Sequence, residues 1–483
     1  MKGKLYILLG TLGIMAAALS GCKKEVKKET VSEEVAVTEA ATPTLEPTIE
    51  PSIEPTAEPT AGAEEEVSVF DADALLEQTK QYAKEMAEGE FSNVFSNFTI
   101  AVKAQVPEST LKSTYESVVE PLGDYIGIYS GEADIKEDYA NVYVVSEYKN
   151  NGLILSVSYN TDLQIRKINL NYYTLNKEVE NSAVKEIDIQ IGEASIPLDG
   201  KLTLPVGVEN PPVVILVQGS GQSDMDETIG ATSNKPLRDI AYGLAERGIA
   251  SIRYNKRYYQ YPELAGDEIT IYDEVLDDVG YAIEFAKTNT LVNSDKLFVA
   301  GHSLGGMLCP KIATDHPEVC GFISLAGSPR KLQEIIYDQN MKLLENMDNV
   351  TDEYKESVKA ELEEMIATIE NLDETTMNTA ILGATGYYWN SLNGIDTKEL
   401  VKNLSIPMLF LQGSADFQVY ADVDFMQWQD LLSERDNVKF KLYSNLNHLF
   451  MESQGLTDTT EYDVMNHVSE NVIADMAEFI MEN

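Results

Sequence analysis

The segment Gly301-His302-Ser303-Leu304-Gly305-Gly306 constrains the fold of this chain more than any other feature of the sequence. It follows an apolar, strand-like run at 296–300 and precedes a helical pattern at 307–314. At a sharp turn from strand to helix the neighbouring chain approaches so closely that a Cβ would collide, and glycines on both sides of the serine avoid this. The segment therefore predicts a strand–turn–helix unit that presents Ser303 as a nucleophile, with a glycine-rich structural turn as the alternative.

Continuous apolar runs alternate with helical patterns on both sides of this segment. The runs are typical of parallel strands buried on both faces, and they lie at 212–218, 249–254, 322–326 and 407–412. Helical spacing of apolar residues is found at 237–247 and 272–287, and two entry strands are expected at 187–191 and 201–204. This alternation predicts a doubly wound, mostly parallel α/β sheet.

Four histidines are available to activate the serine, whose hydroxyl is a weak nucleophile until a base takes its proton. His302 lies within the turn and is expected to face away from the serine. His316 follows the next helix, and His467 lies in the last helical region. His448 remains, in a loop after a predicted strand at 438–443, and it is the predicted base; a hydrogen-bonded surface histidine is the alternative.

A carboxylate is needed to orient the base and to stabilise its cation. The buried run at 407–412 ends in Gly413-Ser414-Ala415-Asp416, which places Asp416 at the carboxyl end of a strand. Asp416 is therefore the predicted acid, with Asp422 and Asp424 as substitutes if the loop folds differently. The alternative for Asp416 is that it caps the following helix.

Residues from about 190 to 483 resemble the α/β-hydrolase-fold serine esterases, close to the dienelactone-hydrolase and prolyl-oligopeptidase-like branches. The chain order serine, acid, histidine of that fold is met by Ser303, Asp416 and His448. The resemblance implies that Ser303 is the nucleophile, Asp416 the acid and His448 the base, cleaving a carboxylic ester through an acyl-enzyme. It also implies an oxyanion hole formed by the backbone N–H groups of Leu304 and Ser220.

Three features of the sequence leave alternatives open. Many relatives have His-Gly where this chain has Gln218-Gly219; a backbone donor should survive this change, but the anchoring of the loop is left open. The acidic loop at 221–228 either contacts substrate or holds itself through side-chain-to-backbone bonds. Arg253 lies in a cluster with two other cations and either binds a carboxylate of the substrate or forms a structural ion pair.

An insertion of mainly helical pattern separates 326 from 406 and is longer than a simple connection. Its helical segments lie at 332–347, 351–371 and 376–392, and we expect them to form a cap, about 328–400, over the nucleophile. The aromatic residues Tyr387, Tyr388 and Trp389 either line the acyl or alcohol pocket under this cap or form the core of the cap.

The N-terminus has the layout of a secretory signal, because Lys2 and Lys4 precede an apolar stretch at 5–19. That stretch is shorter than the roughly 20 residues of a spanning helix. It ends in Leu19-Ser20-Gly21-Cys22, which resembles the bacterial lipobox, where cleavage leaves the cysteine to carry a diacylglycerol group. We expect residues 1–21 to be removed and Cys22 to anchor an extracytoplasmic protein to the cell membrane; an ordinary signal peptide is the alternative.

Residues 22–69 are expected to form a disordered tether. They are rich in Glu, Thr, Pro and Ala, and prolines recur every four residues from 43 to 59. Such a composition cannot bury a core and favours extended polyproline II structure.

A small α+β domain is predicted at 70–176, ahead of the hydrolase-like domain at 187–483. Helical patterns at 71–86 and 108–119 are followed by strand-like runs, which lie at 125–129, 140–147, 153–159 and 165–173. This segment resembles a small domain of unknown function found ahead of hydrolases in exported bacterial proteins. It contains no paired catalytic residues, so we expect a spacer or a module that binds a cell-envelope partner.

The charge of the chain limits its partners. There are 36 Lys and Arg against 80 Asp and Glu, a net charge of −44, which disfavours nucleic acid. The three cysteines are too few for a disulfide framework, and Cys309 and Cys320 are expected to be buried apolar residues. No metal cluster or nucleotide-binding glycine loop is present in the sequence, so no cofactor is expected.

Three functions therefore remain. A serine esterase acting on a small-molecule ester is the first, and a peptidase or acyltransferase with the same triad is the second. A catalytically inactive surface-binding lipoprotein is the third, and the intact Ser303, Asp416 and His448 argue against it.

Overall fold

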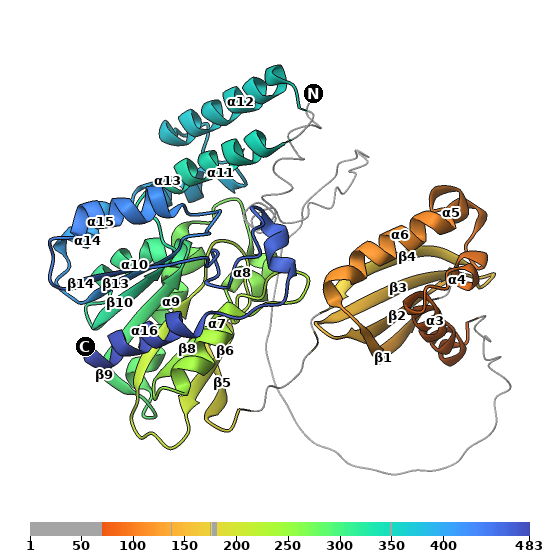
Figure 1. Cartoon of the computed structure of the whole chain (residues 1–483), viewed down its shortest axis with the longest axis horizontal. Helices are drawn as coiled ribbons and strands as arrows, with labels where there is room; N and C mark the ends of the chain where they lie inside the picture. Colours follow the sequence, from red (N-terminus) through yellow and green to blue (C-terminus); the bar gives the residue numbers. More distant parts are fainter. Residues whose placement is uncertain (1–69, 137, 174, 176–180, 348–349) are drawn as a thin grey trace, which may run out of the picture.

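The structure is a computed structural model that describes residues 70–136, 138–173, 175, 181–347 and 350–483. The predicted signal peptide, Cys22 and the proline-rich tether lie outside these residues. Figure 1 shows two folded parts, and each buries a hydrophobic core of its own. No helix among the described residues combines the length and apolar character that crossing a bilayer requires.

The N-terminal part is a four-stranded antiparallel sheet with helices packed on it. Its strands follow each other in chain order and are β1 (Tyr125–Ile135), β2 (Tyr139–Tyr148), β3 (Gly152–Asn160) and β4 (Ile165–Tyr173). The first helix, α3 (Ala72–Ala87), contacts β1 and β2 and begins where the Asp71 carboxylate caps the N–H of Ala74. The remaining helical segments are α4 (Ser92–Ser96), α5 (Ile100–Gln105), α6 (Glu108–Val119) and the 3-10 turn η1 (Glu120–Leu122). The predicted α+β arrangement is confirmed.

The C-terminal part is built on an eight-stranded, mostly parallel sheet of order β14-β13-β10-β9-β7-β8-β6-β5. Its parallel strands are β7 (Pro212–Val217), β8 (Ala250–Tyr254), β9 (Asn293–His302), β10 (Gly321–Leu325), β13 (Met408–Gly413) and β14 (Val438–Tyr443). The hairpin β5 (Val184–Glu193) and β6 (Ile196–Pro205) joins the sheet antiparallel to β8. The predicted α/β sheet is confirmed, and β9, which leads into Ser303, lies near its centre.

The side chains of β7 alternate between two cores, one on each face of the sheet. Helices pack on both faces and are α7 (Pro236–Ala245), α9 (Asp277–Thr288), α10 (Leu304–Asp315), α15 (Met426–Leu432) and α16 (Glu470–Glu482). Val213 and Ile215 belong to the core shared with α9 and α10, whereas Val214 and Leu216 belong to the core shared with α7 and α16. Successive side chains of a strand point to opposite faces, so a sheet covered on both sides requires a continuous apolar run.

The cap lies between β10 and β13 and is mainly helical (Figure 1). Its helices are α11 (Leu332–Asn346), α12 (Asp352–Glu370), α13 (Gly386–Asn393) and α14 (Thr397–Asn403). The helical pattern expected at 376–392 is wrong in its first half, which forms a short hairpin of β11 (Ala380–Ile381) and β12 (Ala384–Thr385). Leu382 and Gly383 both have positive φ, the geometry that a two-residue hairpin turn favours.

Short helical turns complete the C-terminal part. They are α8 (Arg257–Gln260), η2 (Pro262–Leu264), η3 (Tyr272–Leu276), η4 (Ala421–Phe425) and η5 (Thr459–Asp463). Two of them, η3 and η4, are π-helical and lead directly into α9 and α15. Turns of this kind occur frequently at functional sites, and η3 carries Glu274, which contacts the loop that follows β7.

The two folded parts touch at the turn between β2 and β3. The Asn151 side-chain amide donates to the carbonyl oxygen of Ala231 at 2.9 Å and to the hydroxyl of Ser233 at 2.7 Å.

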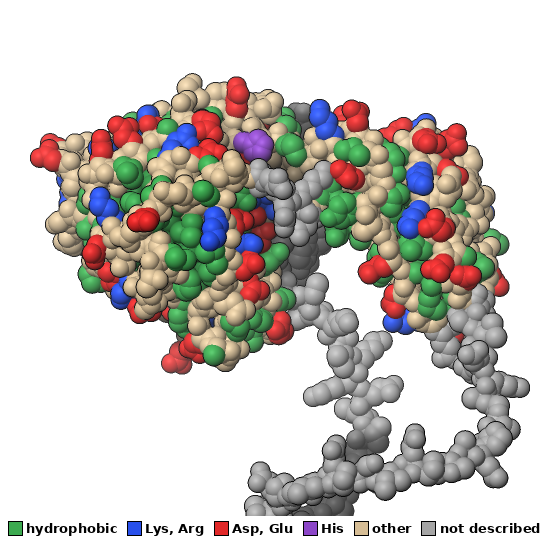
Figure 2. All heavy atoms as spheres, turned by 90° about the horizontal axis from the view of Figure 1, so that it is seen from below, with side chains coloured by type: hydrophobic (Ala, Val, Ile, Leu, Met, Phe, Trp, Pro, Cys, Tyr) green, Lys and Arg blue, Asp and Glu red, His purple; other side chains and the backbone are tan. Residues whose placement is uncertain are grey.

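On the face shown in Figure 2, acidic side chains are spread over both parts and interspersed with Lys and Arg. The excess negative charge is thus distributed over this face and not gathered in one patch.

Candidate active site

Ser303 lies at the turn between β9 and α10, with φ +52° and ψ −113°. A non-glycine residue in this region of backbone space is strained by about 1–3 kcal/mol and is held there by its surroundings. A Cβ on Gly301 would lie 2.3 Å from the carbonyl of Gly305. A Cβ on Gly305 would lie 2.7 Å from the carbonyl oxygens of Val217 and Gln218. The glycines therefore permit the close packing that presents Ser303 at the end of the sheet.

Asp416 and His448 meet at the carboxyl end of the sheet. Asp416 lies beyond β13, and its Oδ2 is 2.7 Å from Nδ1 of His448, which follows β14. Both side chains are buried. The carboxylate is fixed further by the Gln412 amide at 2.7 Å and by the N–H groups of Gln418 and Val419 at 2.8 and 2.9 Å. Because this carboxylate accepts from Nδ1, Nε2 of a neutral His448 is left as the acceptor that a general base needs.

His448 lies beside the turn that carries Ser303. The ring of His302, the residue before the serine, has its centroid 4.7 Å from that of His448. His302 Nε2 is 3.0 Å from the carbonyl oxygen of His448. No hydrogen bond joins Ser303 Oγ to the His448 ring within the described residues. In unliganded enzymes such bonds are often long and tighten only when substrate is bound.

The substitute acids lie elsewhere. Asp424 is bound by the Ser328 hydroxyl at 2.5 Å and by Arg330 Nε at 2.8 Å, and it belongs to η4. Asp422 is exposed. Of the three candidate carboxylates, only Asp416 contacts the His448 ring.

The two predicted oxyanion donors lie in segments that adjoin Ser303. Leu304 is the first residue of α10, where an N–H has no acceptor within the helix. Ser220 lies in the loop 218–221, which passes so close that a Cβ on Gly219 would lie 3.2 Å from Cβ of Ser303. Neither N–H donates to another group in the described part of the chain. Two unpaired N–H groups beside a nucleophile are what an oxyanion hole requires.

The loop 218–221 is anchored by hydrogen bonds of Gln218 and Gly219. The Gln218 amide donates to the carbonyl oxygens of Tyr254 and Asp224. Gly219 N–H donates to Glu227 Oε1 at 2.7 Å. The departure at Gln218 therefore does not leave this loop loose.

The acidic loop holds itself and the residues beside Ser303. Asp224 accepts from the N–H groups of Asp226 and Thr228 and from the Thr228 hydroxyl. Glu227 Oε1 is also 3.0 Å from Nδ1 of His302. Burial raises the pKa of Glu227, but the charge and hydrogen bond of His302 outweigh it and hold the pKa below its usual value. Of the two interpretations of this loop, the structure supports self-holding.

We expect the Glu227–His302 pair to make stability depend on pH. Burial lowers the pKa of His302, but Glu227 outweighs it and raises the pKa above 6.5. A raised pKa gives stability that is fully present below the unfolded pKa and is lost as pH rises through the folded pKa. The lowered pKa of Glu227 gives stability that is lost only at acid pH.

The wild type should therefore have a higher melting temperature than Glu227→Gln, and this difference in melting temperature should be largest near pH 6. Thermal unfolding of both proteins at about pH 6 and pH 9 measures this difference. Between the two pH values it should narrow by about 2–4 °C for each kcal/mol that the ion pair no longer contributes to the free energy of unfolding. The comparison with the variant removes the contribution of other titrating groups. A gap of equal size at both pH values would contradict the prediction.

Of the two interpretations of Arg253, the structure supports the structural ion pair and not the contact with substrate. Arg253 is 1 % exposed, and its guanidinium forms ion pairs with Glu186 and Asp226 and a 3.3 Å contact with Thr203. All three partners hold it within the fold, so the structural ion pair left open by the sequence is the one observed. The neighbouring Arg257 is likewise paired, with Asp278 at 2.7 Å.

The aromatic residues of the cap contribute mainly to its core. Tyr388 and Trp389 are buried, and the Trp389 indole donates to the carbonyl oxygen of Ile381 at 2.7 Å. Burial raises the pKa of Tyr388 well above its usual value, and the charge of Glu274 acts in the same direction. Tyr387 is half-buried. None of the three lines the pocket at Ser303.

A narrow pocket opens on Ser303 between the sheet and α11. Its volume is about 10 Å³, close to the room of one water molecule. Leu332, Ile335 and Gln339 form one face of α11 toward it, and Gln339 donates to the Gln418 carbonyl oxygen at 2.9 Å. Besides Ser303, the other lining residues are Leu304, Met307, Ser328, Gln418 and Val419. The helical spacing of Leu332, Ile335 and Gln339 is the sequence signal that predicts this wall, and the aromatic cluster at 387–389 is not part of it.

Family models match both parts of the chain. Residues 231–454 match the family model of the serine aminopeptidases, S33, and residues 79–168 match a protein family of unknown function (DUF3887). Esterase EstD of Thermotoga maritima is 35 % identical over 312 residues, which are 64 % of this chain and 71 % of EstD. This chain belongs to the same family of α/β-hydrolase-fold esterases. The resemblance seen in the sequence is confirmed, including its N-terminal domain of unknown function.

Solved structures of esterases and related hydrolases also align with the chain. An esterase from Pyrococcus furiosus is 14 % identical, with 65 % of this chain and 96 % of that chain covered and a TM-score of 0.41. Est1E from Butyrivibrio proteoclasticus is 18 % identical, with 61 % and 98 % covered and a TM-score of 0.39. A dienelactone hydrolase from Anabaena variabilis is 14 % identical, with 62 % and 98 % covered and a TM-score of 0.37.

Proposed function

We propose that this protein hydrolyses carboxylic esters through a triad of Ser303, His448 and Asp416. The observation that supports this most is the 2.7 Å contact between His448 and Asp416 beside the Ser303 turn. Ser303 Oγ bonds to the ester carbonyl carbon while its proton passes to Nε2 of His448, and the carbonyl π electrons move to oxygen. The N–H groups of Ser220 and Leu304 stabilise this oxyanion.

The intermediate then collapses to an acyl-enzyme. The bond to the alcohol oxygen breaks, and the alcohol takes the proton from His448. Water attacks the acyl carbon in the second half, giving a proton to His448, which returns it to Ser303 as the carboxylic acid leaves. Asp416 stabilises the imidazolium in both halves.

Active-site labelling and product analysis test this function on the full-length protein. A fluorophosphonate should label the wild type, and p-nitrophenyl esters of graded chain length should be hydrolysed, with the optimum measuring the acyl pocket. A serine peptidase is the second candidate, and the description of the matching family model, a serine aminopeptidase, supports it. A preference for p-nitroanilides over esters would favour this candidate. Labelling without hydrolysis but with transfer to an added alcohol would indicate an acyltransferase. No labelling would favour a binding lipoprotein whose N-terminal part recognises a cell-envelope partner.

We also propose that the protein is exported and anchored through lipid on Cys22, on the strength of Leu19-Ser20-Gly21-Cys22 after the apolar stretch. Cys22→Ser should abolish incorporation of an alkyne-labelled fatty acid and release the protein from the membrane fraction, because two acyl chains give the stable attachment. Cys320→Ser is the matched control, since it removes a partly exposed thiol, and it should label like the wild type. Fatty-acid labelling retained in Cys22→Ser would contradict the proposal.

A further inference from the structure

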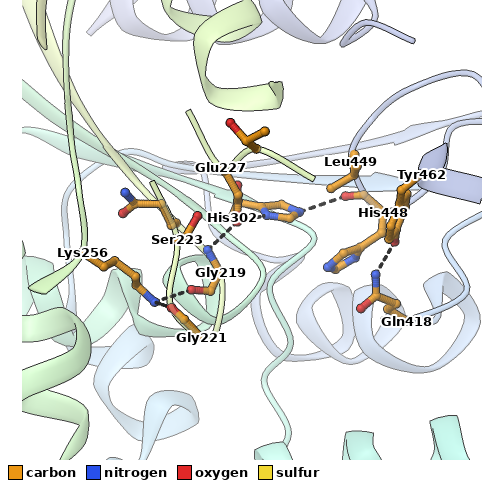
Figure 3. Close-up of polar contacts among 12 residues, drawn as sticks. Gly219, Gly221, Ser223, Glu227, Lys256, His302, Gln418, His448, Leu449 and Tyr462 are labelled. Atoms are coloured by element: carbon orange, nitrogen blue, oxygen red, sulfur yellow. Dashed lines mark hydrogen bonds and ion pairs between the residues drawn. The ribbon is translucent and has the colours of Figure 1, made fainter. Parts of the chain in front are cut away.

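Lys256 is a buried cation that contacts the loop 218–221, as Figure 3 shows. It follows β8 and is 2 % exposed. Its Nζ donates to the carbonyl oxygens of Gly219 at 2.6 Å and Gly221 at 2.9 Å, and to Glu274 Oε1 at 2.9 Å. Burying an ammonium is costly unless it is paired and hydrogen-bonded. Here two of its three partners are main-chain groups of the loop that carries Ser220.

Two carboxylates, one buried and one partly buried, bind the same loop. Glu274, which is 3 % exposed, accepts the N–H of Gly221 at 2.7 Å as well as the lysine ammonium. Glu227 accepts the N–H of Gly219 at 2.7 Å. The polar main-chain groups of both glycines are therefore fixed. The Ser220 N–H between them remains without a partner in the part of the chain that the structure describes.

The Gly219 carbonyl and the Ser220 N–H belong to a single peptide unit. No peptide bond among the described residues is cis, and in a planar trans unit the C=O and N–H point in opposite directions. Because Lys256 holds the carbonyl oxygen, the N–H of Ser220 must point away from Lys256. A cation on the carbonyl also draws electron density toward oxygen, which strengthens the N–H as a donor.

We propose that Lys256 is a positioning residue of the oxyanion hole, which aims and polarises the Ser220 N–H through the Gly219 carbonyl. The inference rests on the proposed ester hydrolysis and adds a component of its transition-state stabilisation. Lys256 does not touch substrate, and its effect passes through one peptide unit. The three cations at 253–257 therefore have different roles. Arg253 and Arg257 form structural ion pairs, whereas Lys256 binds the loop 218–221.

The test compares two variants of the full-length protein. Glu274→Gln keeps an oxygen acceptor for the Gly221 N–H and leaves Lys256 on both carbonyls. Lys256→Met in the Glu274→Gln background removes the cation without leaving a buried, unpaired carboxylate. Arg435→Met is the matched control, because Arg435 also donates to main-chain carbonyls, those of Val401 and Lys402 in the last turn of α14, outside the site.

The measured quantities are kcat and KM for p-nitrophenyl acetate and the Ki of an aryl trifluoromethyl ketone. Ser303 Oγ adds to the ketone carbon, its proton passes to His448, and the carbonyl becomes an oxyanion in the hole. Relative to Glu274→Gln, the double variant should lose about 10²-fold in kcat with KM changed by less than about threefold. The Ki should rise by about the same 10²-fold factor, because the inhibitor uses the same hole. Arg435→Met should match the wild type in all three quantities.

The inference is overturned if the double variant unfolds at the temperature of Glu274→Gln and keeps kcat and Ki within about threefold. Should the double variant not fold, Lys256→Gln decides, because its neutral amide still donates. A loss of about tenfold in kcat with unchanged KM supports the inference, and a wild-type kcat overturns it. Failure of the proposed function is a separate result, in which the wild type itself neither labels with fluorophosphonate nor hydrolyses the ester.

Discussion

Replacing Ser303 with alanine should lower kcat for ester hydrolysis by about 10⁶-fold without unfolding the protein. The change removes the oxygen that forms the acyl-enzyme, so only the oxyanion hole and substrate binding remain to assist attack by water. Alanine keeps the Cβ, so the residue meets the same steric demands at φ +52°. The melting temperature should match that of the wild type, because Ser303 Oγ has no hydrogen bond to another described group whose loss would destabilise the fold.

Steady-state hydrolysis of p-nitrophenyl acetate and fluorophosphonate labelling measure this loss together. The variant should not label, whereas Ser195→Ala, an exposed serine in the turn between β5 and β6, should label and turn over like the wild type. Thermal unfolding of all three proteins shows that any difference is chemical. A folded Ser303→Ala protein that retained both activities would mean that another nucleophile carries the reaction.

The parts of the site that are set by neighbouring residues could be predicted from the sequence. Gly301 and Gly305 flank Ser303 for a local steric reason, and a local pattern of this kind is readable in one chain. Asp416 is predictable as the candidate acid because it directly follows a buried run, and His448 as the candidate base because few histidines compete with it. The continuous apolar run of β7 likewise predicted a sheet covered on both faces.

The contacts that Lys256 makes with the loop 218–221 could not be predicted in this way. Lys256 meets Glu274 and the glycine loop only after β7, β8 and η3 are packed together. Charge alone did not separate it from Arg253, since both lie in one cluster of cations. The partner of His302 depended equally on the path of the acidic loop, which brings Glu227 beneath the Ser303 turn. Contacts set by loop paths have no periodicity that a sequence could reveal.

Asp416→Asn should lower kcat by about 10⁴-fold with KM nearly unchanged. The asparagine oxygen can still accept from the N–H groups of Gln418 and Val419, so the loop keeps its conformation. The amide nitrogen then faces Nδ1 of His448, where the carboxylate oxygen lies at 2.7 Å. A donor in that place favours the tautomer with the proton on Nε2, which cannot accept the proton of Ser303. The imidazolium formed during the reaction also loses its counter-charge.

Asp422→Asn and Asp424→Asn are the controls that make this prediction specific to Asp416. Asp422 is exposed, and its variant should match the wild type in kcat. Asp424 binds Arg330 and Ser328, so its variant should have a lower melting temperature than the wild type, while its kcat should stay near the wild-type value. Measurement of kcat, KM and thermal unfolding for all three variants separates the two effects. A large loss of kcat in the Asp422 or Asp424 variant, with Asp416→Asn near wild type, would move the acid of the triad to that residue and would mean that the loop beyond β13 rearranges when substrate binds.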